Sequence, residues 1–192
     1  MHVVQRICNI QVRRNTNSSE LRTAILESSI AKVSSLGWSE ECIAKTVVEL
    51  GLPPLSHTII HRGSSEMVEF FMDKKREHAM AKMNSTVFPE GENVESIDRK
   101  NQKLVSYIEG HLEYIYPIKK TWPEAMAITL NPEEIKYSMR YVMDITNDLC
   151  EISNIRAARL DWYTERAILG ALFLTTELFF LTDDSENFVE TK

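Results

Sequence analysis

The sequence predicts an all-α protein, and three observations support this prediction. Apolar residues recur every three to four positions along most of the chain, and no stretch alternates long enough for a half-buried strand. Only 6 Gly and 6 Pro occur among 192 residues, which disfavours a turn-rich β protein or a disordered chain. With 43% hydrophobic residues, the chain can bury a sizeable core, and its length favours one domain.

The first 19 residues differ in charge from the rest. They contain Arg6, Arg13 and Arg14 and no acidic residue, so the net charge of -6 becomes -9 over the remaining 173 residues. An acid-free start with Arg, Ser and Asn is typical of a mitochondrial transit peptide, and a plain disordered terminus is the alternative. The acidic body disfavours a nucleic-acid partner, because phosphate binding needs clustered positive charge.

Residues 20–63 predict three short helices in a helix-turn-helix-like subdomain. Helical spacing of apolar residues predicts the first over 20–36, which Gly37 ends, and Ser39 caps a second that runs to Leu50. Pro53 and Pro54 begin the third, which Gly63 ends. The net charge over 39–63 is -1 before the histidines, and the third helix has no Asn, Gln or Lys, so DNA binding is disfavoured.

Residues 64–183 predict the remaining helices. Ser64 and Ser65 begin a fourth helix, whose basic run at 74–76 is predicted to lie on a solvated outer face, with anionic lipid headgroups as the alternative contact. A loop is expected over 84–95, a fifth helix ends at Pro117, and a sixth begins at 122. Asn131 is predicted to cap a seventh helix, and an acidic tail follows over 184–192.

The most apolar stretch is DWYTERAILGALFLTTELFFL, residues 161–181. As a helix it is apolar on every side, so the rest of the domain, a second copy, a membrane or a lipid must cover it. A transmembrane helix is disfavoured because about 20 apolar residues are needed and a polar run at 175–177 interrupts this stretch. Trp162, Tyr163 and Arg166 have a composition enriched at interfaces, although the two aromatics could instead plug the end of a core.

No catalytic constellation is visible by spacing. The Glu-x-x-His pairs of a helical diiron centre are absent, and so are Gly-rich phosphate loops and nucleophile elbows. His57 and His61 stand one helical turn apart, but no third metal ligand is suggested. We therefore expect no enzyme, cofactor or metal site. With 8 Met and abundant apolar helix, the chain is better suited to holding an apolar molecule.

Four stretches together resemble the Coq-nine family of mitochondrial ubiquinone-biosynthesis accessory proteins. They are GWSEECIAKTVVELGLPPLSH (37–57), RGSSEMVEFF (62–71), WPEAMAI (122–128) and DWYTERAILGALFLTTELF (161–179). They occur in the family's order and extend over roughly residues 21–188, and the last stretch is the most specific. The first alone fits many members of the TetR-type regulator superfamily, whose fold the family shares.

The resemblance implies a TetR-like homodimer that has lost DNA binding and lies peripherally on the matrix side of the inner mitochondrial membrane. It implies binding of lipids, including isoprenoid quinone-like species. The implied partner is the diiron hydroxylase that acts on demethoxyubiquinone. Family members also continue into an amphipathic C-terminal helix beyond the position of Lys192.

The resemblance also implies a docking patch for this hydroxylase. In the family, the positions that match Leu149, Trp162, Tyr163 and Arg166 support binding of the enzyme, and all four keep a compatible residue here. Arg159 departs from the family pattern, because an acidic residue is usual at that position. The charge of the patch is therefore expected to differ from that of other members.

The leading hypothesis is a non-enzymatic protein that binds an isoprenoid quinone intermediate and presents it to the hydroxylase. The rivals are a TetR-type transcriptional regulator with a small-molecule or lipid ligand, and a helical scaffold with an ordinary packed core. In the leading hypothesis a largely apolar cavity between the helices holds the lipid. Apolarity alone suggests the side chains near that cavity that would contact lipid: Trp122, Met126, Met143, Phe173 and Leu174.

Overall fold

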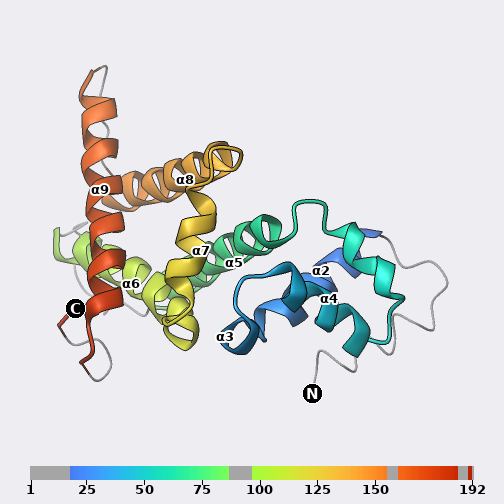
Figure 1. Ribbon diagram of the computed structural model, residues 1–192. Helices are drawn as coiled ribbons and strands as arrows, with labels where there is room; N and C mark the ends of the chain where they lie inside the picture. Colours follow the sequence, from blue (N-terminus) through green and yellow to red (C-terminus); the bar gives the residue numbers. More distant parts are fainter. Residues whose placement is uncertain (1–17, 87–96, 155–159, 186–189, 192) are drawn as a thin grey trace. The chain divides into compact units, whose positions relative to one another are not determined.

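The computed structural model describes residues 18–86, 97–154, 160–185 and 190–191 (Figure 1). No strand occurs among these residues, so the predicted all-α fold is confirmed. The expected transit or disordered segment lies almost entirely outside the described residues, as do most of the expected 84–95 loop and Arg159.

The described helices follow one another in the order α2 (Ser18–Ile30), α3 (Val33–Leu36), α4 (Glu40–Glu49), η1 (Pro54–Ile59), α5 (Ser64–Ser85), α6 (Ile97–Ile115), η2 (Tyr116–Ile118), α7 (Trp122–Thr129), α8 (Ile135–Ser153) and α9 (Leu160–Thr182). They divide into two compact units. The first consists of Met1–Phe71 and Lys120–Glu134, and the second of Met72–Lys119 and Ile135–Lys192.

Three aromatic side chains hold the first unit together. Trp38 lies between α3 and α4, Phe71 on α5 and Trp122 on α7. Their ring centroids are 5.4 Å apart for Trp38 and Phe71, 6.0 Å for Trp38 and Trp122, and 5.1 Å for Phe71 and Trp122. Such tilted and edge-on pairs add to the free energy gained by burial, so α7 packs with the N-terminal helices.

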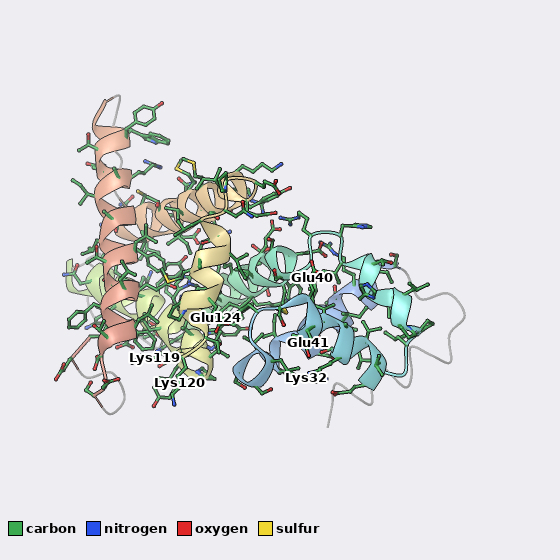
Figure 2. The ribbon with its side chains drawn as sticks, viewed as in Figure 1. Lys32, Glu40, Glu41, Lys119, Lys120 and Glu124 are labelled. Atoms are coloured by element: carbon green, nitrogen blue, oxygen red, sulfur yellow. The ribbon has the colours of Figure 1, made fainter. Side chains whose placement is uncertain are left out.

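In this unit the structure confirms the predicted start of α4, but the helix predicted before it is interrupted by a turn. Ser39 caps α4, since its Oγ accepts a hydrogen bond from the backbone N–H of Cys42 at 3.2 Å. Glu40 and Glu41 follow in the first turn, where the helix dipole favours them (Figure 2). The helix predicted over 20–36 is instead two helices, because a turn at 31–32 separates α2 from α3.

The third predicted helix is present, but it is a 3-10 helix of six residues, η1, and not an α-helix. A ring nitrogen of His57 hydrogen-bonds the carbonyl of Pro54 at 2.6 Å, and the Thr58 hydroxyl donates to the carbonyl of Leu55 at 2.8 Å. Side chains thus occupy backbone carbonyls that would otherwise accept the backbone N–H groups of an α-helical turn. Leu55 is 75% exposed, and the segment provides no α-helical recognition helix.

Two other predicted boundaries also move. α8 begins at Ile135 rather than after Asn131, because the Asn131 side chain accepts the backbone N–H of Glu133 at 3.2 Å and forms a turn. α5 continues through Ser85 into the start of the expected loop.

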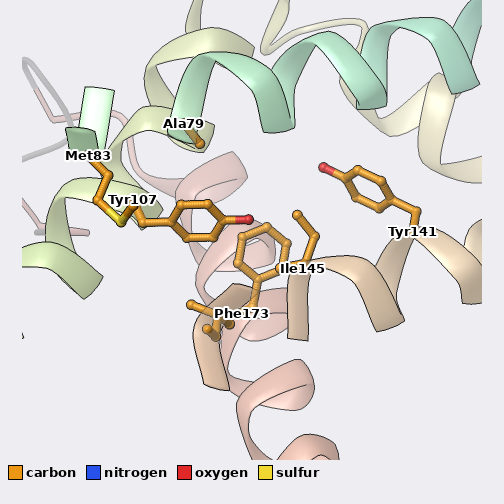
Figure 3. Close-up of a cluster of buried hydrophobic side chains, with 7 residues drawn as sticks. Ala79, Met83, Tyr107, Tyr141, Ile145 and Phe173 are labelled. Atoms are coloured by element: carbon orange, nitrogen blue, oxygen red, sulfur yellow. The ribbon is translucent and has the colours of Figure 1, made fainter. Parts of the chain in front are cut away.

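The core of the second unit is built from α5, α6, α8 and α9 (Figure 3). Its buried side chains are Ala79, Met83, Tyr107, Tyr141, Ile145, Leu149 and Phe173. α5 and α6 approach closely at Gly110, where an added Cβ would lie 2.7 Å from the Cα of Ala79. The blocking atom belongs to the α5 backbone and not to a side chain. A side-chain rotation therefore cannot make room for a larger residue at position 110.

We predict that Gly110→Ala destabilises the protein by about 1–3 kcal/mol, because the added methyl pushes α5 and α6 apart. Gly170→Ala is the matched control: its Cβ would meet only the Thr146 hydroxyl at 3.2 Å and a Val142 methyl at 3.7 Å. Alanine's higher helix propensity, worth up to about 1 kcal/mol, offsets that contact. Urea unfolding measures both, and equal effects of the two substitutions would contradict the close approach.

Candidate functional site

Helix α9 has an inner and an outer face within the second unit. Gly170, Phe173, Glu177 and Phe180 are buried on the inner face. The outer face exposes large apolar side chains by 38% to 61%: Ile168, Leu172, Leu174, Leu178 and Phe179. Residues four positions apart are neighbours on a helix, so Ile168 and Leu172 form one exposed apolar pair and Leu174 and Leu178 another. Exposed apolar side chains that gather in this way are typical of contact sites for another molecule.

Helix α8 also exposes large apolar side chains. Ile135, Met139 and Met143, which follow one another at four-residue intervals, are exposed by 43%, 63% and 43%. Methionine side chains adapt to irregular apolar partners. α8 packs directly on α9, since Gly170 lies against Thr146 and Val142 (Figure 1). From here on, the name outer face covers the exposed apolar residues of both helices: Ile135, Met139 and Met143 of α8, and Ile168, Leu172, Leu174, Leu178 and Phe179 of α9.

The first turns of α9 bring together three of the four predicted docking residues. The guanidinium carbon of Arg166 lies 3.8 Å from the ring centroid of Trp162, whose ring meets that of Tyr163 edge-on at 4.7 Å. Arg166 also donates to the Asn147 side chain on α8 at 3.1 Å, which fixes its position. Tyr163 is 69% exposed. Trp162, Tyr163 and Arg166 are named the aromatic patch below.

Leu149 does not share this surface. It is only 2% exposed and belongs to the core cluster, because it follows Ile145 by one turn on the inward side of α8. It therefore supports the helix from beneath and cannot touch a partner while α8 stays packed. That the patch docks a hydroxylase stays a prediction.

The predicted lipid-contact residues do not gather at one place. Trp122 is buried and Met126 half-buried in the first unit. In the second unit Phe173 is buried in the core, whereas Leu174 and Met143 lie on the outer face. Adjacent helical residues point about 100° apart, so Phe173 and Leu174 cannot line the same surface.

The sequence predicted a solvated outer face for the basic run at 74–76, and Lys75 contradicts this prediction. Lys75 is completely buried, and its Nζ donates to Oε1 of Glu177 on α9 at 2.9 Å. The same ammonium lies 5.3 Å from the Tyr141 ring centroid and 5.7 Å from that of Phe173. Burial lowers the pKa of Lys75, while Glu177 opposes that shift.

A second ion pair begins one residue further along α5, at the partly exposed Arg76. Arg76 donates through Nε and Nη2 to the two carboxylate oxygens of Asp148, at 2.6 and 2.7 Å. The Tyr107 hydroxyl donates to the same carboxylate at 2.6 Å. Burial, followed by the neighbouring carboxylate, raises the pKa of Tyr107, so its hydroxyl stays protonated.

His111 is the least satisfied polar side chain of this core. It is fully buried between the rings of Tyr107 and Phe173, with centroid distances of 4.7 and 5.0 Å. Neither ring nitrogen has a hydrogen-bond partner among the described residues, and the same holds for the Tyr141 hydroxyl. Burial first, and then the charges of Lys75 and Arg76, hold the pKa of His111 well below its usual value.

The described residues contain no group of three or more His, Cys, Asp or Glu placed to hold a metal ion. None of the described helices combines the length and sustained apolar character that a bilayer crossing requires.

Comparison with known proteins finds a family match over the part of the chain that contains α8 and α9. Residues 135–192 match the family model for COQ9, and this range begins at the first residue of α8. The chain is 30% identical over 86% of its length to the probable ubiquinone biosynthesis protein coq9, mitochondrial, of Dictyostelium discoideum. The predicted resemblance to the Coq-nine, or COQ9, family is confirmed.

Two further COQ9 proteins show the same extent of similarity. The mitochondrial ubiquinone biosynthesis protein COQ9 of Drosophila melanogaster is 28% identical over 89% of the chain, and that of Homo sapiens 25% over 91%. The chain spans about half the length of these COQ9 relatives, with 54%, 52% and 55% of their residues aligned.

We predict that Lys75→Met destabilises the protein by about 3–5 kcal/mol, because it removes the ammonium group that pairs with the buried Glu177 carboxylate. The double variant Lys75→Met, Glu177→Leu should recover most of that loss, since a packed apolar pair replaces a buried ion pair at little cost. Urea unfolding of the wild type, the single variant and the double variant checks this. A double variant no more stable than Lys75→Met would contradict the pairing.

Stability is predicted to fall as the pH drops below about 6.5, because His111 is neutral when folded and gains a proton when unfolded. Its contribution is complete above the unfolded pKa and is lost at about 1.4 kcal/mol per pH unit below it. The measurement is urea unfolding between pH 7.5 and 5. His111→Leu should flatten this slope, whereas the exposed His61→Gln should keep it; equal slopes in the wild type and His111→Leu would contradict the assignment.

Proposed function

We propose that this chain acts in mitochondrial ubiquinone biosynthesis, as a non-enzymatic protein that binds an isoprenoid quinone intermediate and presents it to the diiron demethoxyubiquinone hydroxylase. The observation that carries the proposal is the position of the COQ9 match. Residues 135–192 contain α8 and α9, and these two helices carry both the outer face and the aromatic patch. The names of the relatives refer to ubiquinone biosynthesis and to mitochondria.

The outer face supports the lipid part of the proposal. A polyprenyl tail laid on exposed apolar side chains gains about 25 cal/mol for each square ångström removed from water. Met143 and Leu174, two of the predicted lipid-contact residues, are on this face. In our proposal the chain works peripherally at the matrix side of the inner membrane, as a homodimer, and a second copy or lipid covers the outer face.

The aromatic patch supports the partner part. Trp, Tyr and Arg dominate the binding energy of many interfaces. Here the Trp162 ring and the Arg166 guanidinium are stacked and anchored to α8, so little conformational freedom is lost on docking. The exposed Tyr163 ring adds apolar area beside them. A transcriptional regulator is not proposed, because η1 does not provide the α-helix that such a protein inserts into the major groove.

Trp162→Lys is predicted to abolish capture of the hydroxylase, with a loss of at least about 2 kcal/mol, typical of an interface anchor. The control is Leu55→Lys, which places the same charge at an exposed apolar residue of the first unit. Capture by immobilised chain checks both variants, with circular dichroism to show that each is folded. Undiminished capture by folded Trp162→Lys would refute docking at the patch.

Lipid extracted from the purified chain is predicted to contain an isoprenoid quinone or its precursor. Mass spectrometry of the extract identifies the bound species, and Leu174→Glu, which puts a charge on the outer face, should reduce its yield. Folded protein from a quinone-producing host that carries no such lipid would refute lipid presentation.

A further inference from the structure

We propose that Met139 and Met143 form an oxidation site that regulates the outer face: a hydroperoxide converts their thioethers to sulfoxides, and the bound lipid is released. The identity of that lipid rests on the proposed function. Both residues lie in the first half of α8, with exposed fractions of 63% and 43%. Side chains four positions apart on a helix are neighbours, so the two thioethers share one surface.

Exposure distinguishes these two methionines from the others that the structure describes. The others are buried or half-buried: Met67, Met72, Met80, Met83 and Met126. A peroxide must reach the sulfur atom to oxidise it, so the rate of oxidation follows exposure. Met139 and Met143 are therefore the methionines that a peroxide oxidises first.

The step needs a hydroperoxide as its only co-reactant. The thioether sulfur attacks one peroxide oxygen, so that an S–O bond forms and the O–O bond breaks. The sulfur loses two electrons and the departing oxygen gains them. A proton passes from the transferred oxygen to the departing one, which leaves as water when the oxidant is hydrogen peroxide. The product is methionine sulfoxide, and methionine sulfoxide reductases reverse the change.

Each sulfoxide makes part of the outer face polar. The thioether is apolar and adapts to irregular apolar partners, whereas the sulfoxide oxygen is a hydrogen-bond acceptor that water solvates. A polyprenyl tail has no donor for this oxygen, and burying a polar group without a hydrogen bond costs free energy. Met143 is also one of the predicted lipid-contact residues, so the change falls where lipid is proposed to bind.

Lipid and peroxide compete for the same two side chains. Lipid that covers the outer face keeps peroxide away from Met139 and Met143, and their sulfoxides then disfavour the return of lipid. Because a ligand that binds one state depletes the other by mass action, bound lipid protects the thioethers. Oxidation therefore traps the uncovered state until a reductase restores the thioethers.

Treatment of the full chain with hydrogen peroxide, followed by peptide and native mass spectrometry, tests the proposal. We expect sulfoxides at Met139 and Met143 to form at least about tenfold faster than at Met67 and Met83. Bound isoprenoid lipid should fall by about tenfold or more. The double variant Met139→Leu, Met143→Leu keeps the apolar volume and should retain its lipid under peroxide. Met126→Leu, the same substitution in the first unit, is the matched control and should lose lipid as the wild type does.

A dye measurement separates this site from the proposed function. Anilinonaphthalene sulfonate binds exposed apolar surface, and Leu172→Glu identifies the part of its fluorescence that comes from the outer face. A wild-type chain without any lipid would refute lipid presentation, and the dye would still decide the oxidation site. Its fluorescence should fall on oxidation of the wild type and stay constant in the double leucine variant.

Three results would overturn the oxidation site. The first is equal oxidation rates at Met139 and the buried Met67. The second is oxidised wild-type protein that keeps its lipid or, if it carries none, its dye fluorescence. The third is the same loss of lipid or dye in the double leucine variant, which would show that peroxide acts elsewhere in the chain. Slower oxidation of Met139 and Met143 in lipid-loaded protein, and recovery of lipid binding after reductase treatment, would support it.

Discussion

The buried ion pair between Lys75 and Glu177 determines how α9 is rotated in the second unit. Burying an unpaired charge costs several kcal/mol, so Glu177 must face α5, where Lys75 lies 2.9 Å away. Phe173 and Phe180 share that side of α9 and are buried with it. A rotation of α9 by one residue would separate the two charges. The ion pair therefore determines which apolar side chains of α9 are buried and which are exposed to solvent.

Polar groups from α5, α6 and α8 continue this arrangement beside the ion pair. α5 contributes Arg76, α6 Tyr107 and His111, and α8 Asp148. Buried polar groups of this kind add little to stability unless all of them are paired, and His111 has no partner among the described residues.

Local signals in the sequence predicted much of the fold, and tertiary contacts account for what they missed. The Ser39 cap and the apolar periodicity are local, and the all-α fold followed from them. The burial of Lys75 was detectable in part, because buried residues of α5 recur every four positions: Met67, Phe71, Lys75, Ala79 and Met83. Its partner stands 102 residues away, and no spacing rule connects the two.

The candidate site was also only partly predictable, because local sequence patterns do not reveal contacts between distant residues. A helix apolar all round does not reveal which face the chain itself covers, so the sequence could not show that Phe173 is in the core while Leu174 is exposed. Leu149 on α8 was predicted in a docking patch although it is buried. The aromatic patch was predictable because Trp162 and Arg166 are one turn apart on one helix. The cavity lined by the end of α5, the start of α6 and the end of α8 was not predictable, because these three segments are far apart in sequence.

The central claim is that the outer face of α8 and α9 is a binding surface, covered by another molecule in the working protein. Native mass spectrometry of the full chain, purified without detergent, tests this claim most directly, because one spectrum reports both copy number and bound lipid. The account predicts particles heavier than the single 22.1 kDa chain, as dimers, lipid complexes or both, that Leu172→Glu converts to the bare chain. A wild-type spectrum that contains only the bare single chain across micromolar concentrations would contradict it.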